Sequence, residues 1–146
     1  MAISKRCEYA LRAIFELGVR NTDQPVKIQA IARAQAIPTR FLEAILNELK
    51  HAGFVASKRG NDGGYYLVRR IEDLKVSEIM EAIQGSLAVG PENSQHDTYC
   101  CGDHAFDAFW THVNHAISHV CGSTTFAQLK KAEAVSHAEQ VQHYWI

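Results

Sequence analysis

The chain has 146 residues, of which 47% are hydrophobic and 21% are charged. These values suit one domain with a hydrophobic core, or one compact domain with an extension whose apolar face a partner covers. No apolar run reaches the roughly 18 residues of a membrane span, and charges interrupt the apolar N-terminal segment, which argues against a signal peptide. We therefore expect a cytoplasmic protein with no membrane partner. Its four cysteines include an adjacent pair, which argues for metal-binding or redox-sensing thiols rather than structural disulfides.

The formal net charge of −1 conceals an uneven distribution. Residues 1–75 contain 13 Lys and Arg against 8 Asp and Glu, whereas residues 76–146 contain 2 against 8. The basic half suits a polyanion, and a polyanion would repel the acidic half. Seven of the eight histidines also lie in the acidic half, so the sequence predicts two functions in two parts of the chain.

Helical periodicity predicts three helices in the first part of the chain. Ser4 is expected to cap a helix that extends to about Arg20. The run "IQAIARAQ" predicts a short second helix over residues 28–35, and Pro38 stands at the start of a third helix, which Gly53 ends. The apolar positions of the third helix are expected to face the core: Phe41, Leu42, Ile45, Leu46 and Leu49.

The next elements are a hairpin and three further helices. The runs "FVASK" and "YYLVR", separated by the turn-forming segment "RGNDGG", predict a β-hairpin. "VSEIMEAIQG" predicts a fourth helix, and residues 86–103 lack periodicity and are expected to form a loop. A long helix over about residues 104–120 and a last helix with a Ser or Thr cap in "STTFAQLKKAEAVSHAEQ" follow. The expected fold class is mainly α with a small β-hairpin wing: a winged helix-turn-helix plus a long helix.

This order of elements predicts binding to double-stranded DNA. The third helix of a winged helix-turn-helix presents its solvent face to the major groove, and the hairpin contacts the backbone or the minor groove. Arg40 suits a guanine edge, Thr39 a phosphate or thymine methyl, and Glu43 a cytosine amine, unless they only form a solvated helix face. Basic residues at the hairpin tip suit phosphates. The candidate DNA-binding residues are Gln29, Thr39, Arg40, Glu43, Lys58, Arg59 and Asn61.

Several motifs together resemble one family of regulators. They are "IPTRFLEAIL" followed by "AGFV", the hairpin "KRGNDGGYYL" followed by "VSEIMEAIQG", and the late "FWTHVNHAI" with "STTFAQL". Over almost its whole length the chain is similar to the IscR/NsrR-type regulators of the Rrf2 family. The resemblance implies a homodimeric repressor that binds an inverted-repeat operator. It also implies a DNA-binding domain over residues 1–85, a cofactor or sensor loop over 86–103, and a dimerisation helix and C-terminal helix over 104–146.

The resemblance also implies an iron–sulfur cluster. Many members of the family hold one with three loop cysteines at spacings of about five residues, whereas here the pair Cys100–Cys101 is followed only by Cys121. The chain is more similar to a branch that holds a [2Fe–2S] cluster with two cysteines twenty positions apart and a carboxylate and histidine of the partner's first helix. Arg12 occupies the place of that histidine. The implied ligands are therefore Cys100 or Cys101, Cys121, Glu8 and, as a substitute histidine, His104.

The histidines leave other functions open. His112, His115 and His119 fall on one helical face, with His104 close to the same line. This face suits a zinc or haem site, a pH-responsive interface, or simply contact with solvent. One alternative is therefore a cluster-free thiol-switch or ligand-responsive regulator of the same fold, and another is a haem- or zinc-binding metalloprotein without DNA binding. No arrangement of nucleophile and base predicts an enzyme.

Overall fold

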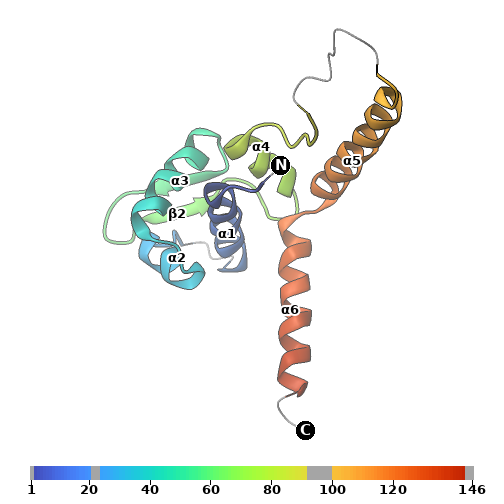
Figure 1. Cartoon of the computed structure of the whole chain (residues 1–146). Coiled ribbons are helices and arrows are strands. Elements are labelled where there is room, and N and C mark those ends of the chain that lie inside the picture. The colour runs from blue at the N-terminus through green and yellow to red at the C-terminus, as the bar shows by residue number, and fades with distance from the viewer. Residues whose placement is uncertain (1, 21–23, 92–99, 144–146) are drawn as a thin grey trace.

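The computed structural model describes residues 2–20, 24–91 and 100–143, and it is mostly helical with one two-stranded antiparallel hairpin. Figure 1 shows α1 to α4 and the hairpin gathered in one body, from which α5 and α6 extend in different directions. The predicted fold class is confirmed. The elements in chain order are α1 Lys5–Arg20, α2 Ile28–Gln35, α3 Thr39–His51, β1 Val55–Lys58, β2 Gly64–Leu67, α4 Val76–Gln84, α5 Asp103–Ser123 and α6 Phe126–His143.

Local signals place the ends of the first three helices. The Ser4 hydroxyl accepts a hydrogen bond from the backbone N–H of Cys7 at 3.1 Å, which is the predicted cap of α1. Helix α2 covers the predicted residues and ends at Ala36, which takes the left-handed conformation with φ of 51°. Gly53 follows α3 with φ of 81°, a conformation that glycine adopts without strain. These predicted boundaries are therefore confirmed.

One predicted core residue of α3 is not in the core. Leu42, Ile45, Leu46 and Leu49 are buried, but Phe41 is 48% exposed. The prediction was wrong because Phe41 lies at the edge of the apolar stripe, about 100° around the helix from Leu42. The guanidinium of Arg40 covers its ring instead, 4.6 Å from the ring centroid.

The wing is attached to the segment that precedes α2. In the hairpin Val55 pairs with Leu67 and Lys58 with Gly64. On the other edge of β2, Tyr65 and Val26 exchange two backbone hydrogen bonds of 2.8 Å each. A side chain at position 64 would collide with the Val26 carbonyl, so this close approach requires glycine. The pairing places the wing beside the start of α2.

A buried carboxylate connects α1 to α2. Glu16 is 7% exposed, and it accepts hydrogen bonds from Arg20 at 2.6 Å and from the side-chain amide of Gln35 at 2.8 Å. Both of its oxygens therefore have partners, as a buried charge requires. The contact fixes the end of α2 against α1.

The segment between α5 and α6 is fastened to the winged domain. The N–H groups of Phe126 and Val76 donate to the carbonyls of Leu74 at 3.1 Å and Thr124 at 3.0 Å. The Phe126 side chain is 1% exposed. Thr125 and Gln128 cap α6 reciprocally, with distances of 2.8 and 3.3 Å, which confirms the predicted Ser or Thr cap.

The carboxylate of Glu78, on α4, holds the end of the wing. It accepts hydrogen bonds from the Arg69 guanidinium at 2.7 Å and from the backbone N–H of Lys75 at 2.9 Å. Burial would raise the pKa of Glu78, but these two donors hold it below its ordinary value. The guanidinium of Arg69 also lies 5.7 Å from the centre of the Phe54 ring. The end of the wing, the turn between α3 and β1, and α4 are thus connected through one arginine.

Helix α5 is packed on one side only. It contacts α4 but has no fully buried residue. Phe106, Phe109 and Val120 are 65%, 53% and 60% exposed. Within the described parts of the chain, no helix is both long enough and apolar enough to cross a membrane.

The segment that follows α4 is hydrogen-bonded to the middle of α5. Asn114 accepts a hydrogen bond from the Val89 N–H at 2.7 Å and donates one to the Val89 carbonyl at 3.0 Å. The Trp110 ring lies against Gly90, where a Cβ would come within 3.2 Å of it. The first residues of the expected sensor loop are therefore held to α5 by side chains of that helix, whereas residues 92–99 of the loop lie outside the described residues.

Candidate nucleic-acid interface and cysteine sites

A groove between the wing and the first residues of α2 collects most of the predicted DNA-binding side chains. Its floor and walls come from α2, α3 and the hairpin, because the pairing of Val26 with Tyr65 places these elements side by side. Five predicted residues line it, namely Gln29, Glu43, Lys58, Arg59 and Asn61. The structure therefore brings together side chains that lie up to 32 positions apart in the sequence.

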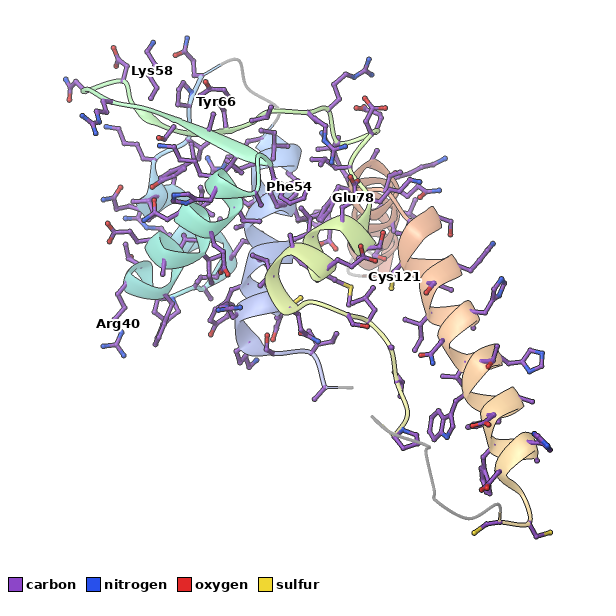
Figure 2. The ribbon with its side chains drawn as sticks, turned by 90° about the horizontal axis from the view of Figure 1, so that it is seen from above. Arg40, Phe54, Lys58, Tyr66, Glu78 and Cys121 are labelled. Atoms are coloured by element: carbon purple, nitrogen blue, oxygen red, sulfur yellow. The ribbon has the colours of Figure 1, made fainter. Side chains whose placement is uncertain are left out.

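Thr39 and Arg40 lie outside the lining of this groove. Both are exposed in the first turn of α3. Figure 2 shows Arg40 and Lys58 on the side of the winged domain that faces away from α5 and α6. The α3 residues and the wing thus share one side of the molecule, although the groove joins only Glu43 to the wing.

The groove carries net positive charge, because its lining has three cationic side chains and one carboxylate, that of Glu43. Among the described residues, the side chains of Lys27, Lys58 and Arg59 form no ion pair. Helix α2 begins without a side-chain cap and without an acidic residue in its first turn, so its N-terminus also attracts anions. The chemistry of the groove therefore suits phosphate oxygens.

Lys27 is not among the residues predicted to bind DNA, because a lone lysine before a short helix is typical of an ordinary surface charge. Its place on the groove depends on the contact between Val26 and Tyr65, which are 39 positions apart. The only local signal is that Lys27 directly precedes the uncapped start of α2.

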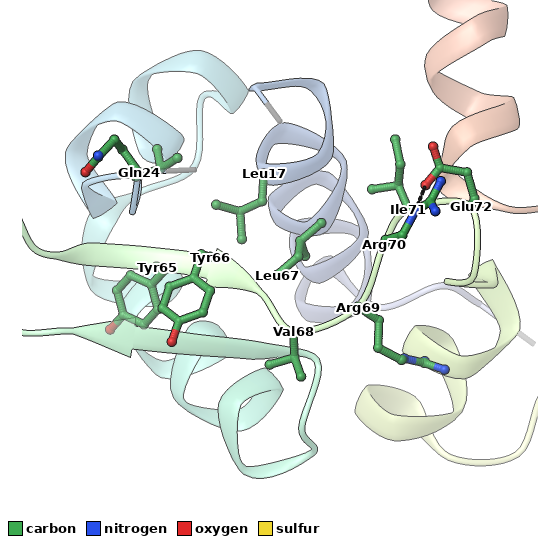
Figure 3. Close-up of a pocket in the computed structure, with 11 residues that line it drawn as sticks. Leu17, Gln24, Tyr65, Tyr66, Leu67, Val68, Arg69, Arg70, Ile71 and Glu72 are labelled. Carbon is green, nitrogen blue, oxygen red and sulfur yellow. Dashed lines mark hydrogen bonds and ion pairs between the residues drawn. The ribbon is translucent and has the colours of Figure 1, made fainter. Parts of the chain in front are cut away.

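A second hollow lies behind the wing, between β2 and the end of α1. Figure 3 shows its lining, which includes Leu17, Tyr65, Tyr66 and Arg69. Arg70 and Glu72 form an ion pair of 3.4 Å at its margin. None of the predicted DNA-binding or metal-binding residues lines this hollow.

The adjacent cysteines lie directly before α5. Cys100 and Cys101 are exposed, and Gly102, with φ of 106°, turns the chain into the helix. The backbone N–H of Cys100 donates to the Asp103 carboxylate at 2.8 Å. His104, in the first turn of α5, is exposed as well. Four residues of metal-binding types are thus close together in the sequence here.

Cys121 lies at the opposite end of α5. The helix is 21 residues long, so at a rise of about 1.5 Å per residue its ends are roughly 30 Å apart. Cys121 is half-buried against the core, and Figure 2 shows it beside α4. One chain therefore does not bring Cys101 and Cys121 to one cluster. In the described residues no three His, Cys, Asp or Glu side chains are grouped to hold a metal ion.

Glu8 and Cys7 have structural partners within the winged domain. The Glu8 carboxylate pairs with Lys5 at 2.8 Å and with Arg12 at 3.3 Å. The hydrogen bond from the Lys5 ammonium, with the Arg12 guanidinium beside it, holds the pKa of Glu8 below its ordinary value. Cys7 is fully buried, and burial raises the pKa of its thiol, as befits a packing residue.

Comparison with known proteins decides the family. The model of the Rrf2 family, described as iron-dependent transcriptional regulators, matches residues 3–132. The chain belongs to the Rrf2 family. An rrf2-like protein of Rhodobacter capsulatus is 39% identical over 104 residues, which cover 69% of each chain. IscR of Xenorhabdus nematophila is 27% identical over 92% of this chain and 82% of its own.

Solved structures of Rrf2-family regulators have the same fold. IscR of T. potens superposes with a TM-score of 0.72 at 30% identity, over 92% of this chain and 90% of its own. CymR of B. subtilis superposes with a TM-score of 0.80 at 24% identity, over 90% and 98%. The predicted resemblance and the predicted role in transcription regulation are therefore confirmed. The residues that bind DNA, the dimer and the cofactor stay predictions.

Proposed function

We propose that this chain is a homodimeric repressor that binds an inverted-repeat operator, with an affinity set by the chemical state of Cys100 and Cys101. The observation that supports DNA contact best is the groove, where Lys27, Lys58 and Arg59, which form no ion pair with another described residue, line the space between the wing and the start of α2. Unpaired cations beside a helix N-terminus bind phosphates and release counterions. Glu43, Thr39 and Arg40 then supply base contacts from α3.

The proposed dimer rests on α5. Its exposed phenylalanines, Phe106 and Phe109, are on a helix that one winged domain does not cover, and a second copy would bury them in a two-fold interface. A two-fold dimer presents two α3 helices to half-sites about 34 Å apart. A change at the start of α5 that alters the spacing of the two winged domains would then alter operator affinity.

An iron–sulfur cluster is the first candidate for the sensing group, and the description of the family as iron-dependent supports iron at this site. Since one chain separates its cysteines by the length of α5, a cluster held by both ends needs donors from two chains. Cys100, Cys101 and His104 would come from one copy, and Cys121 or Glu8 from the other. Thiolates with a histidine or carboxylate are ligands that [2Fe–2S] irons accept, and such mixed ligation raises the reduction potential.

A thiol switch is the second candidate, favoured by the exposure of two adjacent cysteines that lie in no metal-donor group within the described residues. Hydrogen peroxide would accept two electrons from a thiol of this pair and a thiol of the second copy. The two thiol protons would pass to the peroxide oxygens, so that one disulfide and two water molecules form.

Anaerobic purification distinguishes between the two candidate sensing groups. A cluster regulator is expected to be coloured and to contain iron and acid-labile sulfide, and Cys100→Ala or Cys101→Ala is expected to lower both amounts. The controls are Cys7→Ala, whose thiol is buried and separate from the pair, and measurement of DNA binding before and after chelation. A colourless, iron-free chain would exclude the cluster. If mass spectrometry then detects one disulfide after mild oxidation, the thiol switch is supported.

The wing cations are expected to set the salt dependence of operator binding. For Lys58→Ala/Arg59→Ala, the slope of log affinity against log salt should decrease by about 1 for each lost phosphate contact. Fluorescence anisotropy with operator DNA at several salt concentrations measures this slope. The matched control is Lys130→Ala/Lys131→Ala on α6, which removes the same charge outside the lining of the groove. Circular dichroism checks that this control stays folded, because the Lys130 ammonium donates to the Gly18 carbonyl at 3.4 Å. Equal slopes for the two double variants would contradict the assignment of the groove to DNA.

A further inference from the structure

Three histidines form a line on an exposed face of α5. At about 100° per residue, His112, His115 and His119 fall within an arc of about 60°, and Phe106 and Phe109 lie about 90–150° from its centre. All three histidines are exposed. The line is therefore separate from the apolar face that the proposed dimer would bury.

Two of these histidines already lie side by side. His115 and His119 are four residues apart, and their rings are stacked with centroids 6.5 Å apart and planes inclined by 23°. Within the described residues neither imidazole has a hydrogen bond or an ion pair with another group. Two adjacent imidazoles that no other described residue engages have their ring nitrogens available for a ligand.

We propose that His115 and His119 chelate a divalent transition-metal ion, with Zn²⁺ as the representative ion. Imidazole is a preferred ligand of zinc, and two histidines four positions apart on a helix have the spacing of known zinc-binding helices. Each nitrogen must come within about 2.0–2.1 Å of the ion, so the rings approach each other by rotation about their side-chain torsions. Exposed side chains make such rotations on a picosecond to nanosecond timescale. Water completes the coordination sphere.

The position of the pair gives the metal a structural effect. Helix α5 has no fully buried residue, so packing holds it weakly. An ion that bridges His115 and His119 closes one turn and binds the folded helix better than the unfolded chain, which stabilises the helix. The site uses none of the cysteines, so it is independent of the sensing group and of the proposed function.

Calorimetric titration with ZnCl₂ tests the site. The full chain is used with Cys100→Ser/Cys101→Ser, because exposed thiols bind zinc themselves. We expect about one ion per chain, as for a single chelating pair. His115→Gln and His119→Gln should each lower the affinity by at least about tenfold, since even loss of an outer-shell partner weakens a metal site that much. Circular dichroism confirms that each variant keeps its helices.

Two further variants make the test specific. His137→Gln, an exposed histidine on α6, should leave zinc binding unchanged. In the His115→Gln/His119→Gln chain, Ala116→His restores the four-residue spacing with His112 and should restore binding. Equal zinc affinity with and without the two histidines, or no binding to the unsubstituted pair at millimolar zinc, would overturn the proposal. Failure of the respaced variant alone to regain zinc binding would also count against chelation by spacing.

Discussion

Replacement of Phe126 by alanine is expected to lower the free energy of unfolding by about 3–5 kcal/mol. The Phe126 side chain is 1% exposed and belongs to the core that α1 and α4 also form. Its removal would leave a cavity at the point where α6 is fastened to the winged domain, next to the hydrogen bond between Phe126 and Leu74. Because a domain of this size is stable by only about 5–15 kcal/mol, the loss is a large part of the total. Urea unfolding followed by circular dichroism measures it.

The matched control for this substitution is Leu129→Ala, three residues further along α6. Leu129 is 36% exposed, so its replacement by alanine leaves a much smaller cavity. This substitution is expected to lower the free energy of unfolding by less than about 1.5 kcal/mol. Equal losses for the two variants would contradict the assignment of Phe126 to the core. Both are measured at one protein concentration, because dimer formation would add to apparent stability.

Acidic residues at Phe106 and Phe109 are expected to convert the chain to a monomer. Their side chains are 65% and 53% exposed, and in the proposed dimer they would be buried, where an unpaired carboxylate is costly. A monomer engages one half-site at a time, so affinity for the inverted repeat should decrease by about a hundredfold or more. Analytical ultracentrifugation measures the oligomeric state, and gel shifts compare the whole operator with one half-site.

Val68→Glu controls for the effect of an added charge on an exposed apolar residue. Val68 is 55% exposed but follows the wing strand β2 rather than lying on α5. The Val68→Glu variant should therefore have the same oligomeric state as the unsubstituted chain. A dimer that survives Phe106→Glu/Phe109→Glu would show that the two copies associate through another surface. Retained affinity for one half-site would show that the winged domain is still folded.

Elements defined by local chemistry could be predicted from the residues alone. The cap at Ser4, the short helix α2, the hairpin and its glycine-rich turn, and the cap of α6 all depend on residues within a few positions of one another. For the same reason the wing cations and the polar first turn of α3 could be identified as candidates before the fold was known. The family followed from motifs of this local kind.

Contacts between distant segments decided the rest. Phe41 is exposed because the other apolar residues of α3 occupy the core, and periodicity does not show which edge of an apolar stripe its neighbours cover. Lys27 joins the groove only because Val26 pairs with Tyr65. The twenty positions between Cys101 and Cys121 say nothing of distance until a continuous helix fills them and separates the two thiols by about 30 Å. Burial and proximity depend on packing between elements, and that packing is a property of the whole fold.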